Sequence, residues 1–541
     1  MRRLGCSAIL LMISTLMSAG AASATTYYIA ANGSDTNSGT SKSSPWLHAP
    51  GMSGCSGTCS SAAPKPGDSF ILRGGDTWHY SSVAGSPVGT PWTWSASGSS
   101  TSCNLDARLG AVVKTSCIYI GTDHTWYVGP SYARPILNFD NPLSTSYVSS
   151  CAYNQNGQNL IRISANYVIF DDFEILGFCW NSSGGVVFST ASTGVEMSNM
   201  YFHGWTTVSG ETDGFYMMEG SLALTSFQLC DHNVFDGTDA TEGNLPLNAT
   251  GFAIDQNCTE IADNVFHHLS NGVISNMQLV HDNLFENLYE PNDTGTHGNI
   301  VEWDNPRYSS PVLLAFYNNI MHDTNEGEGV NVAMITSNAL FFNNVSWLYR
   351  ETSSHTNGSQ GANCYQLSLQ AAGPSEVNFF NNTSDAPCTY TGQTTGYTSA
   401  FQNNHMIGYS SLSNFISYYG SGSGVVTDNG SEIFQSESAA STQGYGPANA
   451  YAPTSNTNAT VGQGANLTPL CISIGVASLT AACEGSAPTI AEVPGEGGYV
   501  VSVIPGNVRP SSGAWDAGAY EFSAVASGPP GTPPGLSDVV R

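Results

Sequence analysis

The feature that most constrains this chain is a repeat that begins with asparagine. Between residues 167 and 384, an Asn is followed again and again by apolar and aromatic residues, at spacings of 19 to 40 residues. Its occurrences begin at Asn199, Asn233, Asn264, Asn283, Asn318, Asn338 and Asn378. Such a repeat indicates that one small structural unit is stacked many times along the chain.

The segments around these asparagines are typical of β-strands. Residues 167–176 are short, aromatic and β-branched, and few stretches with helical periodicity separate such segments. Parallel strands need long connections, and here the connections consist of further strands and turns. We therefore expect an all-β chain coiled into a right-handed parallel β-helix. Its Asn residues would stand at one corner, where they tolerate the left-handed conformation and bond to one another between coils. A β-sandwich or propeller fits less well, because hairpin signals are sparse and the repeat is irregular.

The two ends of the chain resemble a known group of proteins. Residues 27–35 (YYIAANGSD), 66–78 (PGDSFILRGGDTW) and 509–521 (RPSSGAWDAGAYE) are similar to segments of right-handed parallel β-helix repeat proteins in the pectate-lyase-like superfamily. The resemblance implies a solenoid with capping segments at both ends. That fold hosts many functions, so the resemblance leaves the reaction open.

The sequence also predicts how the chain is divided. A charged start, an apolar run and a small-residue site ending at Ala24 are typical of a signal peptide over residues 1–24. We expect one β-helix domain over 25–522, with an N-terminal cap and first turns (25–135), central turns (136–410), and C-terminal turns and cap (411–522). Residues 523–541 are rich in Gly and Pro and are expected to form a flexible tail. The product would be a secreted extracellular or periplasmic monomer without membrane insertion.

The charge of the chain limits its partners. The net charge is −28, although only 10% of the residues are charged. This surface would repel nucleic acid and anionic membranes. It would also repel an acidic polysaccharide unless cations intervene, and we expect a polysaccharide partner.

Cysteine usage fits an exported protein. Without Cys6 in the predicted signal peptide, 12 of the 13 cysteines remain, and they fall into close pairs along the sequence. The disulfide candidates whose spacing suits one turn of a solenoid are Cys151 with Cys179, Cys230 with Cys258, and Cys364 with Cys388. The sequence does not fix this connectivity.

The densest group of chemically active residues lies between residues 293 and 308. Glu302 and Asp304 alternate along a predicted strand, so they should share one face while Trp303 points to the other. His297 and Arg307 lie close by in the sequence. This pattern predicts a sugar-binding groove or, equally well, a hydrogen-bonded stack of polar turns.

Two cleavage chemistries fit these residues. In β-elimination on a uronic-acid glycan, Arg307 or His297 would act as the base, since all three lysines lie outside the repeat region. In hydrolysis, Asp255, Glu302 and Asp304 would supply the paired carboxyl groups. Common usage of the fold favours a lyase slightly, and the acidic charge favours a hydrolase. A non-catalytic glycan-binding solenoid or adhesin is the third interpretation.

Further residues are candidates for binding. Trp303, Tyr308 and Arg350 would contact the substrate. Asp213 and Asp231 are weak candidates for metal ligands, and calcium is the expected ion.

Overall fold

The structure is a computed structural model, and it describes residues 24–522 apart from short internal segments. The segments outside the description are 86–89, 107–110, 145, 154–158, 181–185, 209–214, 221–226, 240–250, 256–257, 270, 275–276, 289–298, 304–312, 323–328, 334–337, 348–364, 369–374, 386–387, 392–396 and 420–424. The predicted signal peptide and tail therefore lie outside the described residues.

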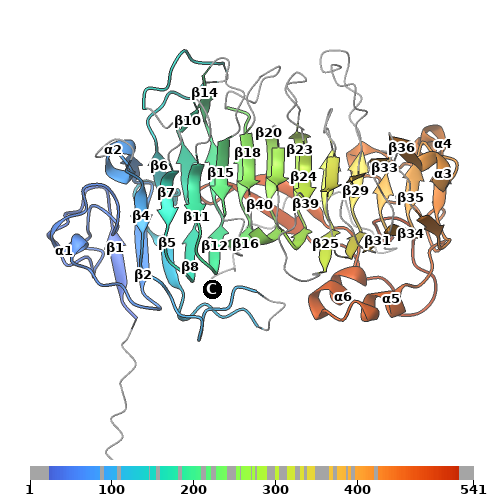
Figure 1. Cartoon of the computed structure of the whole chain (residues 1–541), viewed down its shortest axis with the longest axis horizontal. Coiled ribbons are helices and arrows are strands. Elements are labelled where there is room, and N and C mark those ends of the chain that lie inside the picture. The colour runs from blue at the N-terminus through green and yellow to red at the C-terminus, as the bar shows by residue number, and fades with distance from the viewer. Residues whose placement is uncertain are drawn as a thin grey trace, which may run out of the picture.

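The chain is a right-handed parallel β-helix, as the repeat predicted (Figure 1). Three long parallel sheets run along the solenoid, and each coil adds one strand to each sheet in turn. Sheet A has 13 strands, sheet B has 12 and sheet C has 11. The resemblance to pectate-lyase-like proteins is thus confirmed at the level of the fold.

In sheet A the strands follow the order β1 (Thr26–Ile29), β2 (Ser69–Gly74), β5 (Ile118–Tyr127), β8 (Val168–Asp171), β12 (Val195–Ser198), β16 (Phe227–Asp231), β19 (Cys258–Ala262), β22 (Leu279–His281), β25 (Leu314–Tyr317), β28 (Ala339–Phe342), β31 (Ser375–Phe380), β34 (Tyr397–Gln402) and β37 (Val425–Asp428). In sheet B the order is β3 (Thr77–His79), β6 (Ile136–Asn138), β9 (Glu174–Leu176), β13 (Tyr201–His203), β17 (Val234–Asp236), β20 (Val265–Leu269), β23 (Leu284–Leu288), β26 (Ile320–His322), β29 (Val345–Trp347), β32 (Thr383–Ser384), β35 (His405–Ile407) and β38 (Ile433–Gln435). In sheet C it is β4 (Trp92–Trp94), β7 (Asn159–Ile163), β11 (Val186–Thr190), β15 (Phe215–Glu219), β18 (Gly251–Asp255), β21 (Asn271–Ile274), β24 (Asn299–Trp303), β27 (Gly329–Ala333), β30 (Tyr365–Ser368), β33 (Cys388–Thr391) and β36 (Ile416–Tyr419).

A tight two-residue corner joins sheet A to sheet B in each central coil. Its first residue has positive φ, between 54° and 66°, and the second is a buried Asn in most coils. We predicted that one Asn at the corner would both adopt the left-handed conformation and bond to the Asn of the next coil. The structure corrects this prediction, because two adjacent residues divide these roles. The left-handed residues are Asp172, Asn199, His232, Asp263, Asp282, Asn318, Asn343, Asn381 and Asn403.

The second corner position forms a continuous hydrogen-bonded ladder. In a representative rung, the Asn283 side-chain oxygen accepts from the Asn264 backbone N–H at 3.0 Å and from its side-chain amide at 2.9 Å. The Asn283 amide donates in turn to Asn319 at 3.0 Å and to the carbonyl of Ile261 at 3.0 Å. The ladder consists of Asn233, Asn264, Asn283, Asn319, Asn344, Asn382 and Asn404.

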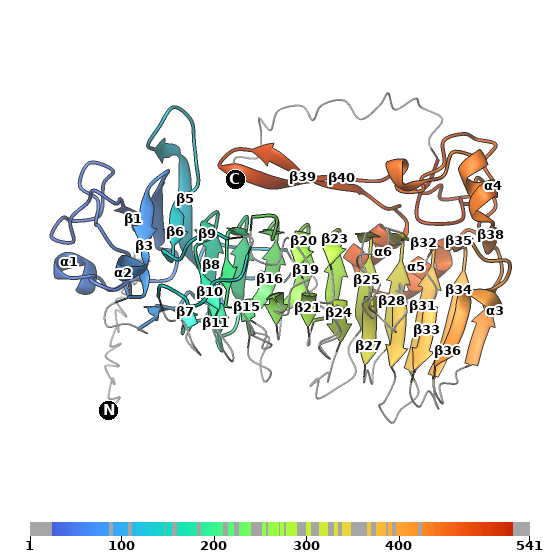
Figure 2. The same cartoon turned by 90° about the horizontal axis from the view of Figure 1, so that it is seen from above.

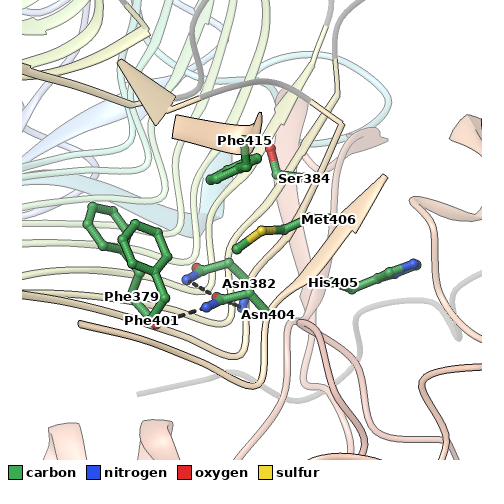
Figure 3. Close-up of a pocket in the computed structure, with 8 residues that line it drawn as sticks. All are labelled: Phe379, Asn382, Ser384, Phe401, Asn404, His405, Met406 and Phe415. Carbon is green, nitrogen blue, oxygen red and sulfur yellow. Dashed lines mark hydrogen bonds between the residues drawn. The ribbon is translucent and has the colours of Figure 1, made fainter. Parts of the chain in front are cut away.

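Stacked apolar side chains fill the interior beside this ladder. Phe202, Phe235, Phe266 and Phe285 stack with ring centroids 5.0, 4.9 and 4.7 Å apart. Figure 3 shows the last rungs, where Asn382 and Asn404 lie beside Phe379 and Phe401 at a small apolar cavity. This cavity belongs to the core and not to a surface site.

Disulfides join five of the sequence-adjacent cysteine pairs. Two of the predicted pairs, Cys151–Cys179 and Cys230–Cys258, are among them. The other three are Cys55–Cys59, Cys103–Cys117 and Cys471–Cys483. Cys364 and the side chain of Cys388 lie outside the described residues, so that pair stays a prediction.

The C-terminal region leaves the coils after β38 and returns along their outside. It forms α4 (Glu437–Thr442), η3 (Pro447–Asn449), α5 (Thr468–Ser473), α6 (Ala477–Cys483) and an antiparallel hairpin of β39 (Thr489–Gly495) with β40 (Gly498–Ile504). Figure 2 shows this hairpin running along sheet B. The expected C-terminal turns of 411–522 thus end near residue 435, and the remainder is an external strap.

Short elements complete the structure. These are α1 (Gly57–Ser60), α2 (Tyr80–Val83), α3 (Leu412–Phe415) and a two-stranded pairing of β10 (Cys179–Trp180) with β14 (Thr206–Thr207). No helix among the described residues is long and apolar enough to cross a membrane.

We expect Asn283→Ala to destabilise the fold strongly. The substitution removes an acceptor shared by two buried donors, and each buried polar group left unsatisfied costs about 1–3 kcal/mol. The free energy of unfolding should fall by about 2–5 kcal/mol in urea titrations. Asn378→Ala is the control, because Asn378 also belongs to the sequence repeat but its side-chain amide donates to the exposed Glu376 and lies outside the buried ladder. Equal losses for the two variants would contradict the assigned role of the ladder.

Candidate active site

A row of polar residues crosses the outer face of sheet C at one register position. Strand pairing aligns one residue from each of the 11 strands, and ten of these residues are polar. In order, they are Thr93, Arg162, Ser189, Glu219, Asp255, Ile274, Glu302, Asn331, Gln366, Thr389 and Ser417. We call this set the polar row.

Strand alternation turns Arg162 and Glu302 outward. Ile161 and Ile163 on either side of Arg162 are buried in the core, whereas Arg162 itself is exposed. In β24, Val301 and Trp303 are likewise buried, and Glu302 between them is half-buried. Ser189 in the same row is buried. The side chains of the following members lie outside the described residues: Asp255, Ile274, Asn331, Gln366, Thr389 and Ser417.

Three carboxylate residues lie in the middle of this row. Glu219 and Asp255 occupy paired positions on neighbouring strands, and Glu302 lies two strands beyond Asp255. Since adjacent strands are about 4.8 Å apart, the backbone positions are separated by about 5 Å and about 10 Å. Partial burial raises the pKa of Glu219 above its ordinary value.

This arrangement has the elements of acid–base chemistry on a glycan. Carboxyl groups about 5–5.5 Å apart suit a retaining glycosidase, and separations of about 6.5–9.5 Å suit an inverting one. A carboxyl group with a raised pKa keeps its proton and can act as the general acid. The row could therefore hold a proton donor next to a base or nucleophile.

The structure places some of the predicted site residues in this row. Glu302 is one of its members. The backbone of Asp255 belongs to the same row, two strands from Glu302 and paired with Glu219 on the adjacent strand. The remaining predicted catalytic and binding residues lie outside the described residues: His297, Asp304, Arg307, Tyr308 and Arg350. Glu219 was not selected from the sequence, because no local motif surrounds it.

The prediction for Trp303 is wrong. Its side chain is only 2% exposed, and its indole N–H donates to the Met277 carbonyl at 3.0 Å. The ring packs edge-on against Phe316 and Phe341 in the core. The alternation that turns Glu302 outward turns Trp303 inward, so this ring offers no stacking surface for a sugar.

Of the two predicted calcium ligands, only Asp231 lies among the described residues. Asp231 lies on sheet A and pairs with His232 at 3.0 Å. Asp213 lies outside the described residues. Calcium binding by this chain therefore stays a prediction.

Sheet A also carries a carboxylate, that of Glu196, which is closed to substrate. Glu196 is 1% exposed, and Lys114 caps it with a contact of 2.6 Å. Burial raises the pKa of Glu196 to about 7, and the nearby Asp231 carboxylate adds to the rise. A buried and capped carboxylate suits a structural role better than catalysis.

Comparisons with known proteins give fold-level likenesses. No family model matches the chain, and no curated protein matches it. Among solved structures it is similar to pectate lyase Pel9A, with 15% identity, 76% of this chain and 80% of that chain covered, and a TM-score of 0.36. It is similar to a rhamnogalacturonan lyase, with 11% identity, 75% and 87% coverage, and a TM-score of 0.37. An alginate lyase from Paenibacillus sp. str. FPU-7 matches at 12% identity, 69% and 92% coverage, and a TM-score of 0.28. We take neither substrate nor reaction from these likenesses.

The buried histidine of sheet A predicts a pH-dependent stability. Burial lowers the pKa of His281, but hydrogen bonds with Asp282 and Glu260 outweigh it and raise the pKa to about 10. Because the folded pKa lies above the unfolded value of about 6.5, this contribution is complete below pH 6.5 and is lost as the pH rises toward 10.

We therefore expect His281→Gln to flatten the fall in stability between pH 6.5 and 9. One retained proton contributes a slope of about 1.4 kcal/mol per pH unit in this window. The measurement is the free energy of unfolding in urea at several pH values. His79→Gln is the control, because that side chain is 59% exposed beside Asp140. An unchanged slope in His281→Gln would contradict the assignment.

Proposed function

We propose that this chain is an exported enzyme that hydrolyses a polysaccharide lying along the polar row of sheet C. The observation that carries the proposal is the alignment of Glu219, Asp255 and Glu302 at one register position of the outer face. A polysaccharide is an extended ligand, and a stripe that crosses many strands matches its shape.

The roles of the carboxyl groups follow from their surroundings. Glu219 is the proposed general acid, because partial burial raises its pKa and keeps the proton in place. Asp255 on the next strand is the proposed nucleophile or base. Pairing with Glu219 would give retention of configuration, whereas use of Glu302 with Asp255 would give inversion.

The charge of the chain supports a neutral glycan as substrate. With a net charge of −28 and three carboxylates in the row, a polyanion would meet repulsion. Five described disulfides and the predicted signal peptide support export to an oxidising compartment.

β-Elimination on a uronic-acid glycan is the second candidate. The exposed Arg162 lies in the same row, two strands from Glu219, and offers a cation for a substrate carboxylate. The carboxylates of the row would then serve calcium binding, and Arg307 is the base predicted from the sequence.

A polysaccharide panel separates these candidates. New reducing ends without absorbance from unsaturated uronates support hydrolysis, and their anomeric configuration identifies the partner of Asp255. Absorbance together with reducing ends would replace hydrolysis by elimination. Binding without any cleavage would contradict both and favour a glycan-binding solenoid.

We expect Glu219→Gln and Glu302→Gln to lower kcat on the substrate that the panel identifies. Removal of a proton-transfer group costs about 10²- to 10⁴-fold in rate. Glu376→Gln is the matched control, because Glu376 is exposed on the outside of sheet A. Full activity in both row variants would exclude these two residues from the reaction.

A further inference from the structure

A row of titratable side chains lies on sheet B. At the third position of six consecutive strands, histidines alternate with carboxylates and an aromatic residue ends the row. The members are His203, Asp236, His267, Glu286, His322 and Trp347. We call this set the His–acid row.

The C-terminal hairpin covers this row. Arg134 fastens its tip by donating to the carbonyls of Gly497 at 3.2 Å and Tyr499 at 2.9 Å. Tyr499 also packs against Tyr201 with ring centroids 5.8 Å apart. The hairpin thereby brings Glu492, more than 200 residues away in the sequence, against the middle of the row.

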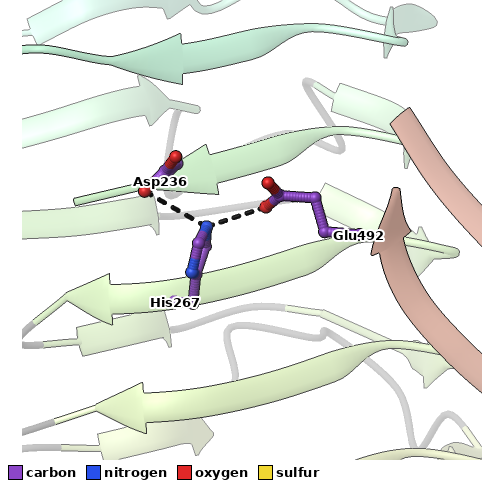
Figure 4. Close-up of side chains that lie close together, drawn as sticks. All are labelled: Asp236, His267 and Glu492. Atoms are coloured by element: carbon purple, nitrogen blue, oxygen red, sulfur yellow. Dashed lines mark ion pairs between the residues drawn. The ribbon is translucent and has the colours of Figure 1, made fainter. Parts of the chain in front are cut away.

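Three potential ligand atoms converge beneath the hairpin (Figure 4). His267 Nε2 lies 3.2 Å from Asp236 Oδ1 and 2.8 Å from Glu492 Oε2, and all three atoms lie within 4.8 Å of one another. Bonds of about 2.0–2.2 Å to one tetrahedral ion place its ligand atoms about 3.3 Å apart. The two separations from His267 Nε2, 3.2 and 2.8 Å, are close to that value.

The converging atoms form ion pairs, but no hydrogen bond of good geometry satisfies them among the described residues. His267 and Asp236 are 7% and 5% exposed. His267 Nε2 and Glu492 Oε2 are nevertheless buried without a hydrogen-bond partner among the described residues. Buried polar atoms of native proteins are normally satisfied, so an unsatisfied pair aimed at one point indicates an additional ligand.

The second nitrogen of the imidazole supports the same conclusion. His267 Nδ1 lies 3.3 Å from His268 Nδ1. A hydrogen bond there would hold the proton on Nδ1 and direct the Nε2 lone pair toward the two carboxylates. A positive charge between these atoms, either a proton on Nε2 or a metal ion, removes their mutual repulsion.

We propose that Asp236, His267 and Glu492 bind a divalent transition-metal ion, with zinc as the best fit, and that this ion clips the C-terminal hairpin to sheet B. One imidazole nitrogen and two carboxylate oxygens are a typical ligand set for zinc. Thr238 and Tyr201 hold the Asp236 carboxylate by hydrogen bonds, as outer-shell residues do in metal sites. The ion links strands that are remote in sequence, so its binding stabilises the closed strap.

The test uses the full mature chain after dialysis against a chelator. Calorimetric titration with Zn²⁺ should show one site per chain. His267→Gln and Glu492→Gln should each lower the affinity for Zn²⁺ by more than about 100-fold, because the loss of an outer-shell partner alone costs about 10- to 100-fold. Glu496→Gln is the control, because Glu496 lies on the same hairpin but outside the ligand group. Hydrogen exchange of residues 489–504 should be slower with Zn²⁺ than with chelator in the wild type and in the control only.

Each other outcome overturns part of the proposal. Absence of zinc binding in the wild type would leave a metal-free ion pair, and zinc binding unchanged in both ligand variants would place the site elsewhere. Tighter binding of Ca²⁺ than of Zn²⁺ would exclude a transition-metal site. Zinc binding without slower exchange of the hairpin would refute its role as a clip. Unchanged circular dichroism of Glu492→Gln confirms that the variant is folded, because Glu492 lies outside the coils.

Discussion

The fold depends on the asparagine ladder at the corner between sheets A and B. From Asn264 onward each ladder oxygen accepts from the backbone and the side chain of the preceding coil, so one residue satisfies three polar groups in the dry interior. Such a rung exists only when successive coils are in register, and a slip of one residue would turn every side chain to the opposite face. The ladder therefore fixes the register of all three sheets, although coil lengths vary.

Because the register is fixed, residues at the same position of successive coils line up and form continuous surfaces. One polar position per coil becomes the polar row on sheet C, and one titratable position per coil becomes the His–acid row on sheet B. Neighbouring strands lie about 4.8 Å apart, which is the spacing at which carboxylates and imidazoles interact. The two rows face different directions, so a glycan-cleaving groove and a metal clip can coexist without competing for the same side chains.

The sequence predicted the solenoid, two described disulfides and the outward direction of Glu302, because these follow from local periodicity. It did not predict the left-handed residue and the ladder Asn as separate positions, and it gave Trp303 a substrate contact that the buried ring cannot make. Glu219 and Asp255 could not be aligned by counting, since loops of different lengths separate the strands. The His–acid row was readable in principle: the third residue after each of the first four ladder Asn residues is Asp236, His267, Glu286 or His322. Glu492 could not be found, because no local pattern tells where the hairpin docks.

The central claim is that the polar row of sheet C binds the glycan. The most direct test is a crystal structure of the Glu219→Gln variant, which lacks the proposed general acid, with an oligosaccharide of the substrate that the panel identifies. The account predicts sugar density along the outer face of sheet C, with a glycosidic bond beside Glu219 and Asp255. An oligosaccharide bound instead on sheet A, on sheet B or against the hairpin would contradict it.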